Sequence, residues 1–468
     1  MATAHSRRNM PTRTERGDRL ALTGICLGFF LVLFDATAVN VATGGITRDL
    51  GASVITLQWV LNAYTVAFAA LMLTAGSLGD RWGARRVYQG GAALFAVSSA
   101  VCAAAPNATT LVTARAVQGI GAAAVVPCSL ALIAHRYPEP VARARALGIW
   151  GGVSGIGLTA GPVMGGWLVA ALGWRSVFLV VVPVSAVSIA LIAARTAEIP
   201  RHATTRPDLR GQLLAVASLV ALTASLTMTS TLGWSSPLVL GLLAVAVALG
   251  AYFVVAEHRV SEPMLPPALF RSSAFSGATG VGLLFNFGLY GVLFCLTIFL
   301  ERTLRQSAAV TGVALLPLTA VTALGALFSG RVTSRFGPRL PMALGLSGGL
   351  LGTCLLAACG DHSGTVALAV FGAITGCVGL CMPAMTGVAL AGLRPQRTGL
   401  GAATLNAARQ AGGALGIAFL GSTAMRRPGA AGPDLPHLRL PMIIAATGYL
   451  IAVIVTLTAI GGPTRRPR

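Results

Sequence analysis

The chain has 468 residues, of which 55% are hydrophobic and only 10% are charged. This composition excludes an ordinary soluble domain and is typical of a polytopic membrane protein. All 34 basic residues are arginine and the formal net charge is +21, a value also met in nucleic-acid-binding proteins. The positions of the arginines relative to the apolar segments decide between these two explanations.

Apolar runs follow one another along the whole chain, and each is long enough, at about 20 residues, to cross a hydrocarbon core of roughly 30 Å. We therefore predict an all-α integral membrane protein. The first run is interpreted as an uncleaved helix and not as a signal peptide, because it is long and contains Asp35. The fourteen predicted transmembrane helices are 20–43, 57–78, 86–105, 108–134, 146–171, 174–194, 211–232, 237–256, 274–300, 309–330, 340–359, 364–392, 399–425 and 440–461.

The arginines are distributed unequally between the two sides of this topology. With the N-terminus in the cytoplasm, 25 of them lie in inner loops and tails, 7 lie in outer loops, and Arg115 and Arg409 lie inside spans. This is the positive-inside rule, and it predicts a multi-pass protein of the cytoplasmic membrane with both termini in the cytoplasm. The inner arginines are expected to meet anionic lipid headgroups, so no nucleic-acid partner is needed.

A short motif occurs twice. Gly76 to Arg85 reads GSLGDRWGAR, and GRVTSRFGPR follows 254 residues later with Gly, Arg, Gly and Arg at the same spacing. Such a repeat predicts two homologous halves of the kind found in transporters. Ser334 replaces Asp80 in the second copy, so the halves are not equivalent. The predicted domains are a six-helix half at 1–194, linkers with two inserted helices at 195–272, and a second six-helix half at 273–468.

Asp35 is the strongest candidate for function, because an acidic side chain deep in a bilayer costs several kcal/mol unless it is used. Asp35 and Arg115 are both expected roughly 10–14 Å below the outer surface at about 1.5 Å per residue, so they can form a buried pair. A carboxylate in that position can gain or lose a proton when the arginine moves or water enters. The alternative is a purely structural ion pair.

Glycines in the fifth predicted span form a second motif. Gly157, Gly161, Pro162, Gly165 and Gly166 follow a rhythm of about four residues, which gives a smooth helical face, and the proline permits a kink. We predict that this helix rocks against a neighbour in the other half. Generic packing of small residues is the alternative.

The loop after the second span is a candidate gate. Its residues Gly76, Asp80, Arg81, Gly83 and Arg85 lie where a carboxylate can cap a helix N-terminus and arginines can meet carbonyls or phosphates. A plain turn with positive-inside arginines is the alternative.

Polar residues inside other spans are candidate contacts for a substrate, or else ordinary packing residues. Arg409 has no acidic residue in the middle of a span of its own half to pair with. The eight cysteines show no metal-ligand grouping, and neither a disulfide framework nor a metal site is predicted. The candidate cavity residues are Asn40, Gln118, Asn286, Tyr290, Arg409 and Gln410.

Four motifs in the expected order resemble the major facilitator superfamily, and within it the fourteen-span drug:proton antiporters of the DHA2 type. They are LFDATAVNVA, GSLGDRWGARR, RAVQGIGAA and GLTAGPVMGG, and the resemblance covers nearly the whole chain. Two positions depart from the family pattern. Thr43 and Gly44 stand where Leu-Pro is usual, which predicts a softer outer end of the first helix, and Ala84 stands where a basic residue is common.

The resemblance implies a secondary active transporter that uses no cofactor and works by alternating access. Asp35 would be the protonation site, Arg115 its modulator, Asp80 and Arg81 would act at the gate, and the glycines with Pro162 would form the rocking interface. The expected partners are a small-molecule substrate, protons and membrane lipids, and the protein is expected to be monomeric. The favoured cargo is an amphipathic drug or antibiotic, and a cationic one could pair with Asp35. Alternatives are an exporter of one metabolite such as an amino acid, a siderophore or a self-made antibiotic, a polytopic membrane enzyme, and a sensor without flux.

Overall fold

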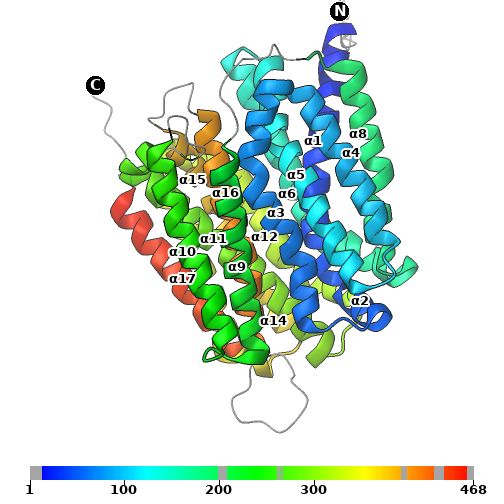
Figure 1. Ribbon diagram of the computed structural model, residues 1–468, viewed down its shortest axis with the longest axis vertical. Coiled ribbons are helices and arrows are strands. Elements are labelled where there is room, and N and C mark those ends of the chain that lie inside the picture. Colours follow the sequence, from blue (N-terminus) through cyan, green and yellow to red (C-terminus); the bar gives the residue numbers. More distant parts are fainter. Residues whose placement is uncertain are drawn as a thin grey trace, which may run out of the picture.

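The computed structural model describes residues 13–198, 208–260, 265, 267–391, 398–425 and 437–460 (Figure 1). Parts of the predicted cytoplasmic linkers, 199–207 and 261–264, lie outside the described residues, as do the ends of both tails. All regular secondary structure in the described ranges is helical; η3 is a π-helical turn and the other η elements are 3-10 turns. The elements are α1 (Arg13–Ala38), η1 (Val39–Ala42), α2 (Thr43–Leu50), α3 (Val54–Trp82), α4 (Ala84–Ala103), α5 (Ala108–Arg136), α6 (Pro140–Leu172), α7 (Arg175–Leu179), α8 (Val181–Arg195), α9 (Leu209–Leu232), α10 (Pro237–Arg259), η2 (Pro267–Arg271), α11 (Ser273–Ile298), η3 (Phe299–Thr303), α12 (Ala308–Phe336), α13 (Arg339–Cys359), η4 (Gly360–His362), α14 (Thr365–Gly376), η5 (Cys377–Leu380), α15 (Cys381–Leu390), α16 (Thr398–Ala424) and α17 (Arg439–Ala459).

Twelve helical segments of the described chain are long and apolar enough to cross a membrane. They correspond to twelve of the predicted spans and establish a multi-pass, all-helical protein. The other two predicted spans, 86–105 and 399–425, are helices α4 and α16, but neither belongs to the twelve. The predicted number of fourteen membrane helices is therefore not confirmed.

Several helices begin at polar residues whose side chains satisfy free backbone N–H groups. Asn107 Oδ1 accepts from Thr110 N at 2.9 Å at the start of α5. The carboxylate of Glu139 accepts from Ala142 N at 3.1 Å at the start of α6. These caps are local to the sequence, and they place the N-termini of two long helices without help from the rest of the fold.

In both copies of the repeated motif, a glycine with positive φ follows the helix. Gly83 follows α3 with a φ of 100°, and Gly337, which lies 254 residues later, follows α12 with a φ of 79°. Residues with a Cβ rarely adopt such angles, so glycine is required at both turns. The two copies therefore share a positive φ at this glycine, while ψ is 124° at Gly83 and 170° at Gly337.

The first predicted span does not continue as one regular α-helix. After α1 ends at Ala38, the chain forms the 3-10 turn η1 and then the short helix α2. Asn40 lies in this turn, and its side-chain amide donates to the Ala36 carbonyl at 3.2 Å. The irregular segment begins at Val39, four residues before Thr43, where the departure from the family pattern predicted a softer end. Asp35 thus lies on the last turn of α1, next to this break.

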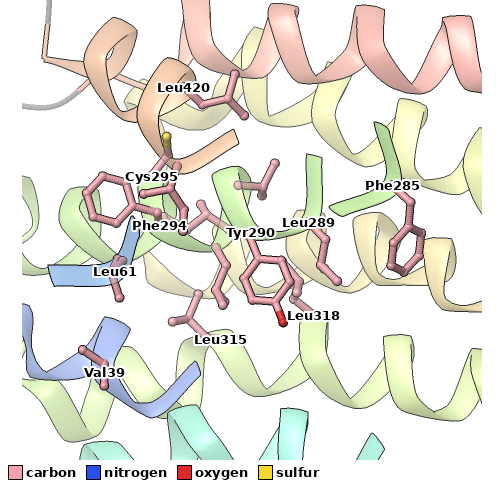
Figure 2. Packing of buried hydrophobic residues seen from close by; sticks show 14 of the residues in the cluster. Val39, Leu61, Phe285, Leu289, Tyr290, Phe294, Cys295, Leu315, Leu318 and Leu420 are labelled. Atoms are coloured by element: carbon pink, nitrogen blue, oxygen red, sulfur yellow. The ribbon is translucent and has the colours of Figure 1, made fainter. Parts of the chain in front are cut away.

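The helices form two groups, the N-terminal group (residues 13–198) and the C-terminal group (residues 267–460), which lie side by side in Figure 1. Hydrogen bonds cross between them: Gln58 Nε2 on α3 donates to the Ile417 carbonyl on α16 at 3.1 Å, and Thr159 Oγ1 on α6 donates to the Thr319 carbonyl on α12 at 3.1 Å. Figure 2 shows part of the apolar core at this boundary, where Tyr290 lies among Leu289, Leu315 and Leu318.

Helices α9 and α10 lie between the two groups in the sequence. Helix α9 contacts both groups, and α10 packs against α9. Gln212 Nε2 on α9 donates to the Ala70 carbonyl on α3 at 2.7 Å, and Thr229 Oγ1 lies 3.2 Å from Ser422 Oγ on α16. In the most apolar stretch of α10 only 11% of residues are buried, against 83% in the segment that contains α11. Helix α11 is thus central, and α10 faces the surroundings of the protein.

Candidate functional site

Asp35, Arg115 and Gln118 form a closed cluster between α1 and α5. Arg115 Nη1 donates to Asp35 Oδ2 at 2.5 Å and to Gln118 Oε1 at 2.7 Å. Gln118 Nε2 donates to Asp35 Oδ1 at 3.1 Å. All three side chains are completely buried. Both oxygens of the carboxylate are therefore occupied by groups from α5, which lies 80 residues away in the sequence.

Helix α3 holds the arginine of this cluster in place. Arg115 Nε donates to the Val60 carbonyl at 3.0 Å, and its guanidinium carbon lies 4.3 Å from the ring centroid of Tyr64. The Tyr64 hydroxyl in turn donates to the Val32 carbonyl on α1 at 3.0 Å. Groups on α1, α3 and α5 thus surround and hydrogen-bond to the buried pair of Asp35 and Arg115. A relative movement of any of these helices therefore changes the environment of Asp35.

The glycine motif of α6 lies against α1. Cβ atoms at Gly157 and Gly165 would come 2.8 Å from the Phe30 carbonyl oxygen and 2.9 Å from Ala38 Cβ, and one at Gly161 would collide with Thr37 Oγ1. Each position therefore admits only a glycine at this helix separation. The contact lies beside Asp35, because Thr37 and Ala38 belong to the same turn of α1.

Two further residues of the motif face the C-terminal group. A Cβ at Gly166 would lie 2.6 Å from the Ala308 carbonyl oxygen, and one at Gly312 on α12 would collide with the Pro162 carbonyl. The sequence predicted a neighbour in the other half for the whole motif. In the structure the motif contacts two neighbours. Gly157, Gly161 and Gly165 of α6 pack against α1, and Pro162 and Gly166 of α6 pack against α12.

The loop between α3 and α4 is joined to the end of α8. Arg85 Nη2 donates to the Ala193 carbonyl at 2.7 Å, and Glu198 Oε1 accepts from Arg85 N at 3.1 Å. Besides its positive φ, there is a second reason for glycine at position 83, because a Cβ there would collide with the Glu198 carboxylate. The second copy of the motif repeats part of this arrangement, since the Arg339 side chain donates to the Leu457 carbonyl on α17.

The other predicted loop residues are Gly76, Asp80 and Arg81. Asp80 and Arg81 are exposed, and a Cβ at Gly76 would lie 3.6 Å from Pro127 Cβ on α5. Glu198 was not predicted as a site residue, because it lies 113 residues from Arg85 in a charged linker where nothing marks its partner. Its carboxylate caps the start of α4 and also lies 3.6 Å from Arg86 Nε.

At the opposite end of the molecule, the end that carries α2, Glu301 connects the two groups of helices. Thr43 Oγ1 donates to Glu301 Oε2 at 2.9 Å, and the backbone N–H of Gly44 bonds to the same carboxylate. Beside it, Arg302 Nη2 donates to Thr47 Oγ1 at 3.3 Å. These bonds hold α2 against η3. The sequence prediction noted Thr43 only as a departure from a family pattern and missed Glu301, its partner 258 residues away.

Replacing Thr43 by valine is expected to loosen this connection. Valine has the shape of threonine without the hydroxyl, so the partly buried Glu301 loses a hydrogen-bond donor, which costs about 1–3 kcal/mol. We expect a thiol introduced by Ala42→Cys, in a cysteine-free background, to react roughly tenfold faster with a maleimide in the Thr43→Val protein. Thr43→Ser keeps the hydroxyl and is the matched control. Equal labelling rates in the valine and serine variants would contradict a latch at this position.

The remaining candidate residues divide into two places. Asn286 and Tyr290 on α11 are buried opposite Arg409 and Gly413 on α16, and a Cβ at Gly413 would lie 3.3 Å from the Tyr290 ring. Gln410, next to Arg409, is half-buried. The side-chain amide nitrogen of Asn40 does not contact this group, because it donates a hydrogen bond to the Ala36 carbonyl within the first helical segment. The structure thus places Asn286 and Tyr290 on the side of α11 that faces Arg409 and α16, and leaves Asn40 near Asp35.

A bundle of membrane-crossing helices with a buried, hydrogen-bonded charge pair between them is the construction of a polytopic membrane transporter. The sequence model of the Major Facilitator Superfamily matches residues 25–417. The chain belongs to this family of membrane transporters, and the resemblance inferred from the four motifs is confirmed.

Curated relatives include resistance and export proteins. The methylenomycin A resistance protein of Streptomyces coelicolor is 37% identical over 71% of this chain and 69% of its own. The multidrug resistance protein Stp of Mycobacterium tuberculosis is 36% identical over 87% and 76%. The tetracenomycin C resistance and export protein of Streptomyces glaucescens is 35% identical over 88% and 77%.

Solved transporters share the fold. The human organic anion transporter MFSD10 superposes with a TM-score of 0.64 at 17% identity, covering 96% of this chain and all of its own. The nucleoside transporter NupG superposes with a TM-score of 0.63 at 14% identity, covering 94% and 100%. At these identities the likeness concerns the fold alone.

Proposed function

We propose that this transporter is a proton-coupled efflux antiporter that exports amphipathic drugs or antibiotics across the cytoplasmic membrane. The observation that carries the proposal is the fully buried Asp35, whose two oxygens are bound by Arg115 and Gln118. A carboxylate in this setting can exchange a proton only when the helices move or water enters. Such conditional exchange is what coupling between protons and a second substrate requires.

The proposed cycle alternates access between the two sides of the membrane. An external proton binds Asp35 as the cargo leaves outward, and reopening toward the cytoplasm returns the proton inside. A membrane potential contributes about 2.3 kcal/mol per elementary charge per 100 mV to the inward movement of the proton. The two-sided packing of α6 on α1 and α12 supports this cycle, because a movement between the groups of helices is passed to the helix that carries Asp35.

We also propose a topology of fourteen spans with both termini in the cytoplasm, in which α4 and α16 cross the membrane with the twelve apolar segments. The 20 and 27 residues of these helices are sufficient for a crossing. Residues 1–194 and 273–468 are proposed as the six-helix halves of a monomer, with the inserted pair in 195–272 between them. A glycine with positive φ at the same place after α3 and after α12 supports equivalent halves.

The relatives favour drugs or antibiotics as cargo. Two are described by a single compound, methylenomycin A or tetracenomycin C, and another as a multidrug resistance protein. The first two support a second candidate function, the export of one antibiotic or another single metabolite. A panel of substrates distinguishes a narrow specificity from a broad one.

The experiment that tests this function uses purified protein in proteoliposomes with an imposed pH gradient. Adding an exported drug is expected to collapse the gradient in the wild type, and Asp35→Asn is expected to abolish the response because the amide cannot take up a proton. Glu139→Gln, which alters an exposed cap at the start of α6, is the control for the loss of one acidic residue. Undiminished drug-triggered proton flux in Asp35→Asn would refute coupling through this residue.

A further inference from the structure

Arg409 is the second arginine that lies in the middle of a helix inside the protein, and its surroundings differ from those of Arg115. The sequence from residue 267 onward contains only three acidic residues, Glu301, Asp361 and Asp434. Glu301 accepts a hydrogen bond from the Thr43 hydroxyl, and Asp361 Oδ1 accepts one from Leu438 N at 2.6 Å. Asp434 lies outside the described residues. Within the part of the chain that the structure describes, Arg409 forms no ion pair.

The guanidinium of Arg409 has more hydrogen-bond donors than the protein satisfies. It carries five N–H groups, and Nη1 donates to Asn406 Oδ1 at 3.2 Å. Its Nε is buried and has no partner. One face of the guanidinium lies over Phe285, with 5.5 Å between the guanidinium carbon and the ring centroid. This cation–π contact uses the face of the guanidinium and not its N–H groups. The side chain as a whole is partly buried, and within the described residues its positive charge has no counter-ion.

Helix α11 presents neutral polar groups on the face opposite Arg409. A Cβ at Gly282 would lie 3.0 Å from Arg409 Cγ, which places this face of α11 against the arginine. Asn286 follows one turn later, is only 1% exposed, and has no partner for either atom of its amide. Tyr290 comes one turn further on the same face. The cluster thus offers a cation, a free amide and an aromatic ring, and no acidic group.

The charge near Asp35 is already balanced. Arg115 and Gln118 occupy both of its oxygens, so in this conformation Asp35 offers no free acceptor to a cationic cargo. The pairing of a cationic cargo with Asp35, which the sequence analysis allowed, depends on such a free carboxylate oxygen. Arg409, in contrast, is partly buried and has no counter-ion within the described residues. A charge that is removed from water without a partner is costly.

We propose that Arg409 and Asn286 bind the carboxylate or sulfonate of an amphipathic organic anion, whose apolar body packs against Phe285 and Tyr290. The anion replaces the missing counter-ion and accepts from the free N–H groups of the guanidinium and from the amide of Asn286. That this anion is also exported rests on the function proposed above. The binding site itself does not depend on proton coupling.

The test uses two fluorescent probes that differ in one charged group. Anilinonaphthalene sulfonate is an anion, and N-phenylnaphthylamine is its neutral counterpart with the same ring system. Both are titrated into the full-length protein in nanodiscs, and the signal of protein-free nanodiscs is subtracted. Charge-assisted hydrogen bonds to the sulfonate are expected to make the anion bind about tenfold more tightly than the neutral probe.

Three substitutions assign this preference to a residue. Arg409→Gln is expected to bring the affinity ratio close to one, while Arg409→Lys keeps most of it because the charge remains. Arg331→Gln removes one positive charge from an exposed position on α12 and is expected to leave the ratio unchanged. If Arg409→Gln does not fold, Asn286→Leu replaces it, with a lower ratio expected from the loss of an amide donor.

Two results overturn the proposal. One is a wild-type protein that binds both probes equally, and the other is a preference for the anion that survives Arg409→Gln, or Asn286→Leu where that variant is used. The titration needs no gradient and no transport, so its outcome is independent of the Asp35→Asn experiment. A site that binds the anion in a protein without drug-triggered proton flux would refute the antiporter and keep the anion site.

Discussion

Arg115→Met is expected to destabilise the protein by about 3–5 kcal/mol, because it leaves the Asp35 carboxylate buried without its cation. Arg115 is completely buried and joins Asp35 on α1 to the Val60 carbonyl on α3, so its loss removes contacts to two helices at once. Methionine fills part of the volume and limits the cavity. The measurement is the midpoint of thermal or denaturant unfolding of the purified protein in detergent.

The double variant Asp35→Asn with Arg115→Met separates the charge from the packing. When both charges are removed together, most of the stability is expected to return, since a buried ion pair adds little beyond an uncharged pair of similar volume. The difference between the double variant and the sum of the single variants is the coupling free energy of the pair. Proton-coupled transport is expected to stay absent, because the proposed protonation site at Asp35 has been removed. A double variant as unstable as Arg115→Met alone would show that packing, and not charge, accounts for the loss.

Gly161→Val is expected to abolish transport and to destabilise the protein by about 1–3 kcal/mol or more through overpacking. A Cβ at Gly161 would collide with Thr37 Oγ1 and come 2.9 Å from Ala38 N, and the backbone of α1 cannot yield there without moving Asp35. The measurements are drug efflux from intact cells and unfolding of the purified protein.

Gly148→Val is the matched control for this substitution. Gly148 lies in the same helix, and a Cβ there would meet no atom within 4 Å. The two variants share the cost of valine in a helix, so a difference between them measures the contact of α6 with α1. Normal efflux in Gly161→Val would mean that this close contact is not required for the transport cycle.

The membrane-crossing segments and the pairing of Asp35 with Arg115 could be predicted from the sequence. Apolar runs have a length set by the bilayer, and a single acidic residue in such a run needs a partner at the same depth. Helix α4 shows the limit of this reasoning. Its start depends on Glu198, which comes from beyond α8, and no local pattern connects the two.

The glycine motif could be recognised but its partners could not. A four-residue rhythm of small residues indicates a close helix contact without naming the other helix. In the structure Gly161 packs against α1 and Gly166 packs against α12, because α6 lies between these two helices. Glu301 is a similar case, since its hydrogen bond to Thr43 joins the two groups of helices and has no counterpart in sequence spacing.

The sequence by itself determined that this protein is a multi-pass helical transporter of the Major Facilitator Superfamily, because hydropathy and short motifs are properties of contiguous residues. Only the tertiary structure decided that Asp35 is fully occupied while Arg409 has no counter-ion within the described chain. Both arginines lie in the middle of apolar helices and look alike in the sequence. Their difference depends on which helices approach them, and charge compensation acts over a few ångströms between segments that are far apart in the chain.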